Sequence, residues 1–132
     1  MIKILILFAM IFCHIVDDYY LQGWLASAKQ KKYWEENALD EMYKNDYKMA
    51  LFMHSFSWSF MIMLVPIIYA LFVGLNGDIL FWYVYYFVWN LCFHMWMDNN
   101  KANKKECNLI EDQIFHLSQI AITWLCYVVL MI

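Results

Sequence analysis

Long apolar segments alternate with shorter polar connections along the chain. Apolar residues dominate four segments: Ile2–Gly23, Met49–Val73, Ile79–Met97 and Gln113–Ile132. A helix needs about 20 mostly apolar residues to cross the hydrocarbon core of a bilayer, and each segment has or approaches that length. The pattern therefore predicts an all-α, polytopic membrane protein whose four transmembrane helices form one bundle, a single domain over residues 1–132.

Composition agrees with this prediction. Hydrophobic residues make up 64% of the chain and aromatic residues 20%, whereas soluble domains contain about 45–50% apolar residues. The formal net charge of -3 does not indicate nucleic acid as a partner. Membrane lipids are the expected surroundings, and the composition does not specify an oligomeric state.

The lysines predict an orientation. The connection between the first two segments contains Lys29, Lys31, Lys32, Lys44 and Lys48, and the connection between the last two contains Lys101, Lys104 and Lys105. The opposite side has only Lys3. Because short loops rich in lysine stay in the cytoplasm, we expect both of these connections to be cytoplasmic and both termini to lie outside.

The first of these connections also contains many aromatic residues. Tyr33, Trp34, Leu39, Met42, Tyr43 and Tyr47 occur at spacings that a helix could gather on one side. A short helix lying in the membrane interface explains the pattern. A solvated linker with aromatic anchors explains it equally well.

Polar residues interrupt the predicted spans at regular intervals. His14 precedes Asp18 by four positions, His94 precedes Asp98 by four, and Asp112 precedes His116 by four. Residues four apart project from the same face of a helix. His54, near the start of the second segment, completes the four histidines of the protein. All of these positions fall in the half of the bundle nearest the lysine-rich connections, so we expect them to converge on one site.

Imidazole nitrogens and carboxylate oxygens are ligands for Zn²⁺, Mn²⁺ or Fe²⁺, with zinc the first expectation. The predicted ligands are His14, Asp18, His54, His94, Asp98, Asp112 and His116. They exceed the four ligands of one zinc ion and would suit two ions bridged by an aspartate. Residues expected to support the ligands or attract a phosphate are Asp17, Gln22, Lys29, Asn90, Lys101 and Gln113. Helix boundaries, interhelical hydrogen bonds and the orientation rule explain these last residues as well.

The ordered motifs resemble the domain of unknown function 3307 family, a group of small bacterial and phage membrane proteins. The matching positions are His14, Asp18 and Gln22, then Lys29, His54, His94, Asp98, Lys101, Asp112, Gln113 and His116. A looser likeness connects the chain with membrane-bound metal-dependent hydrolases. The resemblance implies a metal site in a bacterial inner membrane and suggests hydrolysis. The extra acid Asp17 leaves open which neighbouring aspartate is the ligand, although the spacing favours Asp18.

These observations favour a membrane-embedded, metal-dependent hydrolase that acts on a lipid headgroup or a phosphoester at the cytoplasmic leaflet. Asp18, Asp98 and Asp112 are its candidate catalytic carboxylates, one of which could serve as general base. The alternatives are a metal- or proton-binding transporter, a di-iron redox protein, and a membrane interaction protein with a structural metal site. The absence of polar groups from the outer half of the segments argues against a path through the membrane.

Overall fold

The computed structural model describes residues 1–38 and 40–132, and the described part consists of helices and short connections, with no strand. The α-helices are α1 (Ile2–Val16), α2 (Leu25–Ala28), α3 (Lys31–Asn37), α4 (Asp46–Val73), α5 (Gly77–Asn99) and α6 (Leu109–Thr123). Turns of π-helix extend three of them, namely Asp17–Leu21 after α1, Asn100–Lys104 after α5 and Trp124–Val129 after α6. A short 3₁₀ turn, Glu41–Tyr43, precedes α4. The predicted all-α class is confirmed.

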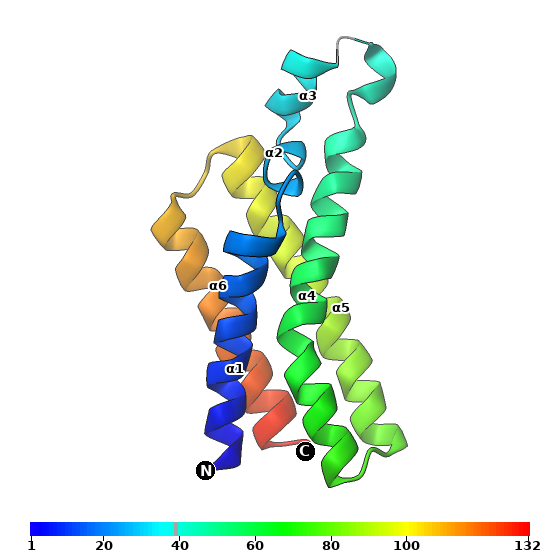
Figure 1. Ribbon diagram of the computed structural model, residues 1–132, viewed down its shortest axis with the longest axis vertical. Coiled ribbons are helices and arrows are strands. Elements are labelled where there is room, and N and C mark those ends of the chain that lie inside the picture. Colours follow the sequence, from blue (N-terminus) through cyan, green and yellow to red (C-terminus); the bar gives the residue numbers. More distant parts are fainter. Residues whose placement is uncertain (39) are drawn as a thin grey trace.

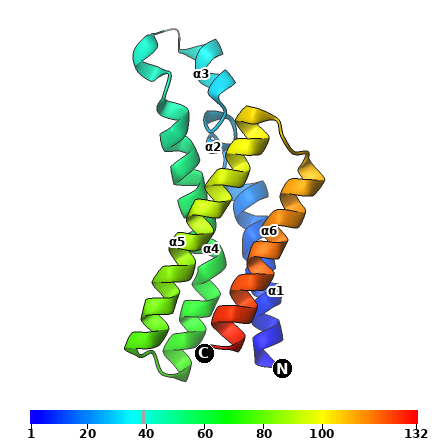
Figure 2. The ribbon, with the colours of Figure 1, turned by 180° about the vertical axis from the view of Figure 1, so that it is seen from behind.

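The long helices α1, α4, α5 and α6 form the bundle (Figure 1). Helix α4 packs against α1 and α5, and α6 packs against α5 and α1. Both termini lie at one end of the bundle together with the turn between α4 and α5. Helices α2 and α3 and the connection between α5 and α6 lie at the other end (Figures 1 and 2). All the lysines except Lys3 therefore occur at or near the end opposite the termini, which we call the lysine-rich end.

Two helical segments are long and apolar enough to cross a membrane. They are Ile2–Leu21 and Glu41–Val73, with mean hydropathies of 1.8 and 2.1. Length and composition therefore support two of the four predicted spans. Helices α5 and α6 do not meet the same criterion because α5 is rich in tryptophan and tyrosine and both carry histidine, aspartate and amide side chains.

The first connection contains a helix shorter than the aromatic pattern predicts. Helix α3 covers only Lys31–Asn37, and the rings of Tyr33 and Trp34 form edge-to-face contacts with each other and with Trp24. Leu39 lies outside the described residues. A helix is thus present in this connection, and its position at a membrane interface stays a prediction.

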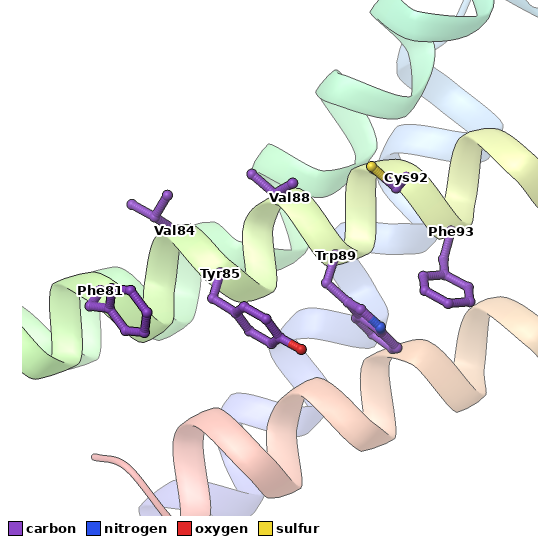
Figure 3. Close-up of a pocket in the computed structure, with 7 residues that line it drawn as sticks. All are labelled: Phe81, Val84, Tyr85, Val88, Trp89, Cys92 and Phe93. Carbon is purple, nitrogen blue, oxygen red and sulfur yellow. The ribbon is translucent and has the colours of Figure 1, made fainter.

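The interior of the bundle is mostly apolar in one half and polar in the other. Toward the termini the core consists of side chains such as Ile6, Met10, Ile62 and Val128. Toward the lysine-rich end the buried side chains are histidine and aspartate, described below. The outward surfaces are apolar: Figure 3 shows a shallow groove along the outer face of α5, lined from Phe81 to Phe93 by apolar, aromatic and cysteine side chains.

Helix α6 begins at Leu109, four residues before the predicted start at Gln113. A capping box explains the earlier start. The Asn108 side chain accepts hydrogen bonds from the backbone N–H groups of Ile110 and Glu111, at 2.9 and 3.0 Å. The Glu111 carboxylate in turn accepts the backbone N–H of Asn108 at 2.9 Å. These bonds satisfy N–H groups that the first turn of a helix leaves free.

Replacement of the cap tests its contribution. We expect Asn108→Ala to destabilise the protein by about 1 kcal/mol, because alanine cannot accept the two N–H groups. Asn108→Asp keeps the acceptor and should retain the stability. Thermal unfolding of the purified variants, followed by intrinsic tryptophan fluorescence, measures both effects, and equal midpoints for the alanine and aspartate variants would contradict this role.

Candidate metal centre

All four histidines come together in the polar half of the bundle, each from a different long helix. His14 is on α1, His54 on α4, His94 on α5 and His116 on α6. Their side chains are buried, with exposed fractions of 1% or less. The i, i+4 spacing of the sequence brings a carboxylate beside three of them: Asp18 beside His14, Asp98 beside His94 and Asp112 beside His116.

One group of donors gathers between α1, α4 and α5. The Nε2 atoms of His54 and His94 are 3.1 Å apart. The Oδ2 atom of Asp98 lies 3.0 Å from Nε2 of His54 and 3.8 Å from Nε2 of His94. The Oδ1 atom of Asp18 lies 3.5 Å from Nε2 of His54.

A second group lies beside the first, between α5 and α6. Here Nε2 of His116 is 3.4 Å from Oδ1 of Asp98 and 3.3 Å from Oδ1 of Asp112. Asp98 therefore belongs to both groups, and its two carboxylate oxygens face different histidines.

The separations of 3.0–3.8 Å between the histidine Nε2 atoms and the neighbouring carboxylate oxygens fit ligands of one metal ion. Bonds of about 2.0–2.1 Å to a tetrahedral ion place its ligand atoms roughly 3.3 Å apart. Three of the atoms, Oδ1 of Asp18, Oδ1 of Asp112 and Nε2 of His116, are buried and have no hydrogen-bond partner among the described residues. A buried polar atom without a partner is costly, and one cation in each group would satisfy these atoms. Two sets of residues in this cluster could each hold a metal ion: Asp18, His54 and His94, and His94, Asp98 and His116.

Two lysines contact the carboxylates from the lysine-rich end. Lys29, directly after α2, donates to Oδ2 of Asp98 at 2.6 Å. Lys101, in the π-helical turn after α5, donates to Oδ2 of Asp112 at 2.5 Å. Burial lowers the pKa of Lys101, but the hydrogen bond and the negative charge of Asp112 outweigh burial and raise it above the ordinary value. Both lysines are thus placed to neutralise negative charge at the site.

His14 has a different environment from the other histidines. The indole N–H of Trp58 donates to Nδ1 of His14 at 2.8 Å, and Nε2 of His14 is 3.0 Å from Oε1 of Gln113. An indole N–H is only a donor, so His14 accepts at Nδ1 and donates at Nε2. Hydrogen bonds occupy both ring nitrogens, and His14 lies outside both groups of donors.

The neighbouring aspartates Asp17 and Asp18 have separate partners. Asp17 accepts a hydrogen bond from the Ser57 hydroxyl at 2.6 Å, whereas Asp18 faces His14 and His54. The structure therefore places Asp18 in the cluster, as the spacing favours. Gln22 donates to the backbone carbonyl of Asp18 and holds that turn in place.

Gln113 and Asn90 take different positions. Gln113 joins His14 to Asp112, because its Nε2 donates to Oδ2 of Asp112 at 3.2 Å. Asn90 instead lies deeper in the bundle, where its amide donates to Thr123 at 2.9 Å and accepts from Gln119 at 3.3 Å. It does not contact a predicted ligand in the described structure.

Thr123 and Tyr127 are buried in the half nearest the termini, so the expectation of an outer half without polar groups is wrong.

Several contributing residues are not evident from the motifs. Trp58 stacks on the His94 ring, with centroids 4.1 Å apart, and it follows His54 by one helical turn, a spacing that could have identified it. Asn103 donates to the backbone carbonyl of Lys29 at 3.1 Å and accepts the backbone N–H of Lys31 at 2.6 Å. Asn103 fixes the connection that carries Lys29, and no local pattern indicates that role.

The chain matches no family model, no curated protein and no solved structure. The resemblance to the domain of unknown function 3307 family consequently stays a prediction. The case for a metal centre depends on the geometry of the chain itself.

Comparing the two neighbouring aspartates tests the centre. We expect Asp18→Asn to lower the affinity for Zn²⁺ by at least about 100-fold, since loss of a residue that only supports a ligand already costs about 10–100-fold. Asp17→Asn keeps an acceptor for Ser57 and should leave the affinity unchanged. Titration of the chelated, purified protein with Zn²⁺ measures both values, and equal losses in the two variants would contradict the assignment.

Proposed function

We propose that the protein is an integral membrane hydrolase that uses two divalent metal ions to cleave a phosphoester at the cytoplasmic face. The position of Asp98 carries this proposal. Its Oδ2 faces His54 and His94, and its Oδ1 faces His116. A carboxylate whose oxygens point toward two separate sets of donors is the bridge expected between two ions.

The two groups differ in how many donors they offer. The first group has four donor residues, Asp18, His54, His94 and Asp98. The second group has three, Asp98, Asp112 and His116. A zinc site with three protein ligands keeps its fourth position for water or substrate. Paired ions of this kind turn a bound water into hydroxide at neutral pH and stabilise both oxygens of an in-line displacement.

Protein side chains at the same place suit a phosphate. Lys29 and Lys101 reach the carboxylates from the lysine-rich end, with side chains 14% and 34% exposed. Their ammonium groups are free to turn toward an anion when a metal ion takes over the charge of Asp98 and Asp112. Among the candidate catalytic carboxylates, Asp112 has Oδ2 beside Lys101 and Oδ1 toward the second group, so we assign it to metal binding, and a metal-bound hydroxide would itself act as the base.

All four long helices of the bundle are proposed to span the membrane. In α5 and α6 the polar residues face inward, where His94, Asp98, Asp112 and His116 are buried. The outward side chains of the same helices are apolar, among them Phe81, Val84, Val88, Ile114, Leu117 and Ile122. Soluble monomers rarely expose such continuous apolar surface. Averaged hydropathy underrates these helices because it counts inward polar residues that lipid would not meet.

Hydrolysis of p-nitrophenyl phosphate by the purified protein tests the activity. We expect release of p-nitrophenol with Zn²⁺ or Mn²⁺ and none after chelation. Asp98→Asn should lower kcat by at least about 100-fold, the usual cost of removing one electrostatic contact to a transition state. Asp78→Asn, at the opposite end of the bundle, is the matched control. Metal binding without any turnover would contradict the enzyme and indicate a structural metal site.

Cysteine labelling tests the orientation. In a variant that retains only Cys107, beside the lysine-rich end, a membrane-impermeant maleimide should react in inverted membrane vesicles and not in intact cells. Partial burial and the carboxylates of Asp112 and Glu111 raise the pKa of the Cys107 thiol, so labelling should be faster at mildly alkaline pH, where more thiolate is present. A cysteine-free variant carrying Asp78→Cys should give the reverse pattern. Labelling of Cys107 in intact cells would contradict the proposed topology.

A further inference from the structure

An apolar groove runs along the bundle between α1 and α6. Its apolar lining consists of Ile11, Ile15, Tyr20 and Leu117, and its polar lining consists of groups of His14, Tyr19 and Gln113. The volume of the groove is about 500 Å³. This volume is in the range of small-molecule binding sites. Ile15, Tyr20 and Leu117 are exposed, so the groove is open toward the surroundings of the bundle.

The groove leads to the proposed metal centre. Tyr19 and Gln113 line the groove and also line the cleft that contains Asp18, Asp98 and Asp112. Gln113 contacts Asp112 directly. A molecule lying in the groove would therefore have one end within reach of the candidate catalytic carboxylates.

Cationic side chains lie beside the carboxylates and extend beyond them. A further cleft of about 380 Å³ at the lysine-rich end is lined by Lys29, Lys101 and Lys105 and shares Asp98 with the cleft of the carboxylates. The three spaces form a series that is apolar at the side of the bundle, carries carboxylates and two lysines in the middle, and is mainly basic at the end. An amphiphile with an apolar chain and an anionic head has the matching order of chemistry.

We propose that the substrate is a membrane lipid with a terminal phosphate monoester, whose acyl chain enters laterally between α1 and α6. This inference rests on the proposed hydrolase function and specifies its substrate. The phosphate lies between the metal centre and the lysines. Water adds to phosphorus, the bond from phosphorus to the lipid oxygen breaks, and that oxygen takes a proton, so inorganic phosphate and the lipid alcohol are released.

The surroundings of the carboxylates favour a monoester over a diester. The positive charge of two divalent ions and three lysines would exceed the negative charge of the three carboxylates. The lysines are Lys29, Lys101 and Lys105, and the carboxylates are Asp18, Asp98 and Asp112. A dianionic monoester gains more from this excess of positive charge than a monoanionic diester does.

Blocking the groove separates lipid from water-soluble substrates. Leu117→Trp narrows the groove, and Ile122→Trp adds the same bulk to α6 at an exposed position outside it. We expect Leu117→Trp to lower kcat/KM for dioleoyl phosphatidic acid in detergent micelles at least 10-fold and to leave kcat/KM for p-nitrophenyl phosphate unchanged. Ile122→Trp should leave both values unchanged. Ile15→Trp, on the α1 wall of the groove, provides a second blocking variant.

The possible results separate failure of the lipid groove from failure of the proposed hydrolase. The groove is not a lipid site if Leu117→Trp and Ile15→Trp affect both substrates equally. The same holds if the protein cleaves p-nitrophenyl phosphate but not the lipid. Either result leaves the proposed hydrolase in place. If the wild type cleaves neither substrate, the proposed hydrolase is wrong. Native mass spectrometry then decides the lipid site separately: retention of phosphatidic acid by the wild type and its loss in Leu117→Trp would support the site, and equal retention by both would overturn it.

Discussion

The burial of Asp98 is the constraint on which the rest of the structure depends. A carboxylate with 3% of its surface exposed is stable inside a helical bundle only when cations or hydrogen-bond donors surround it. Lys29, His54, His94 and His116 provide them, from four different parts of the chain. The contacts with Lys29, His54 and His116 fix how their elements sit against α5, which itself carries His94 and Asp98. The same contacts produce an arrangement that can hold a metal ion, so the interactions that organise the fold also build the site.

This constraint accounts for the distribution of polar and apolar residues over the bundle. Because the charged and imidazole groups face one another, the outer surfaces of the long helices are left to apolar side chains. The apolar half of the core, around Met10 and Ile62, seals the centre from the end that carries the termini. Access is left to the lysine-rich end and to the groove between α1 and α6. In the proposed reaction, a lipid and water would approach the same carboxylates from different directions.

Local spacing was sufficient to predict much of this site. The i, i+4 pairs Asp98 with His94 and Asp112 with His116 lie together because helix geometry alone sets their faces. Local spacing could not predict that His14 lies outside the donor groups, because its ring nitrogens form hydrogen bonds with Trp58 and Gln113 from other helices. Asn90 has the right helical face but lies one turn too deep and pairs with Thr123. Contacts between helices depend on their rotation and depth, which hydropathy does not encode. The lengths of α5 and α6 were predictable to within a few residues, whereas averaged hydropathy alone identifies neither as a span.

In the proposed centre, Asp98 bridges two metal ions held by histidine and carboxylate ligands. X-ray absorption spectroscopy of the zinc-loaded protein tests it most directly, because it reports both the ligand atoms and the distance between neighbouring metals. We expect nitrogen and oxygen ligands at about 2.0–2.2 Å and a second zinc at about 3.5–4 Å. A spectrum with a single isolated zinc, or with sulfur ligands at about 2.3 Å, would contradict it.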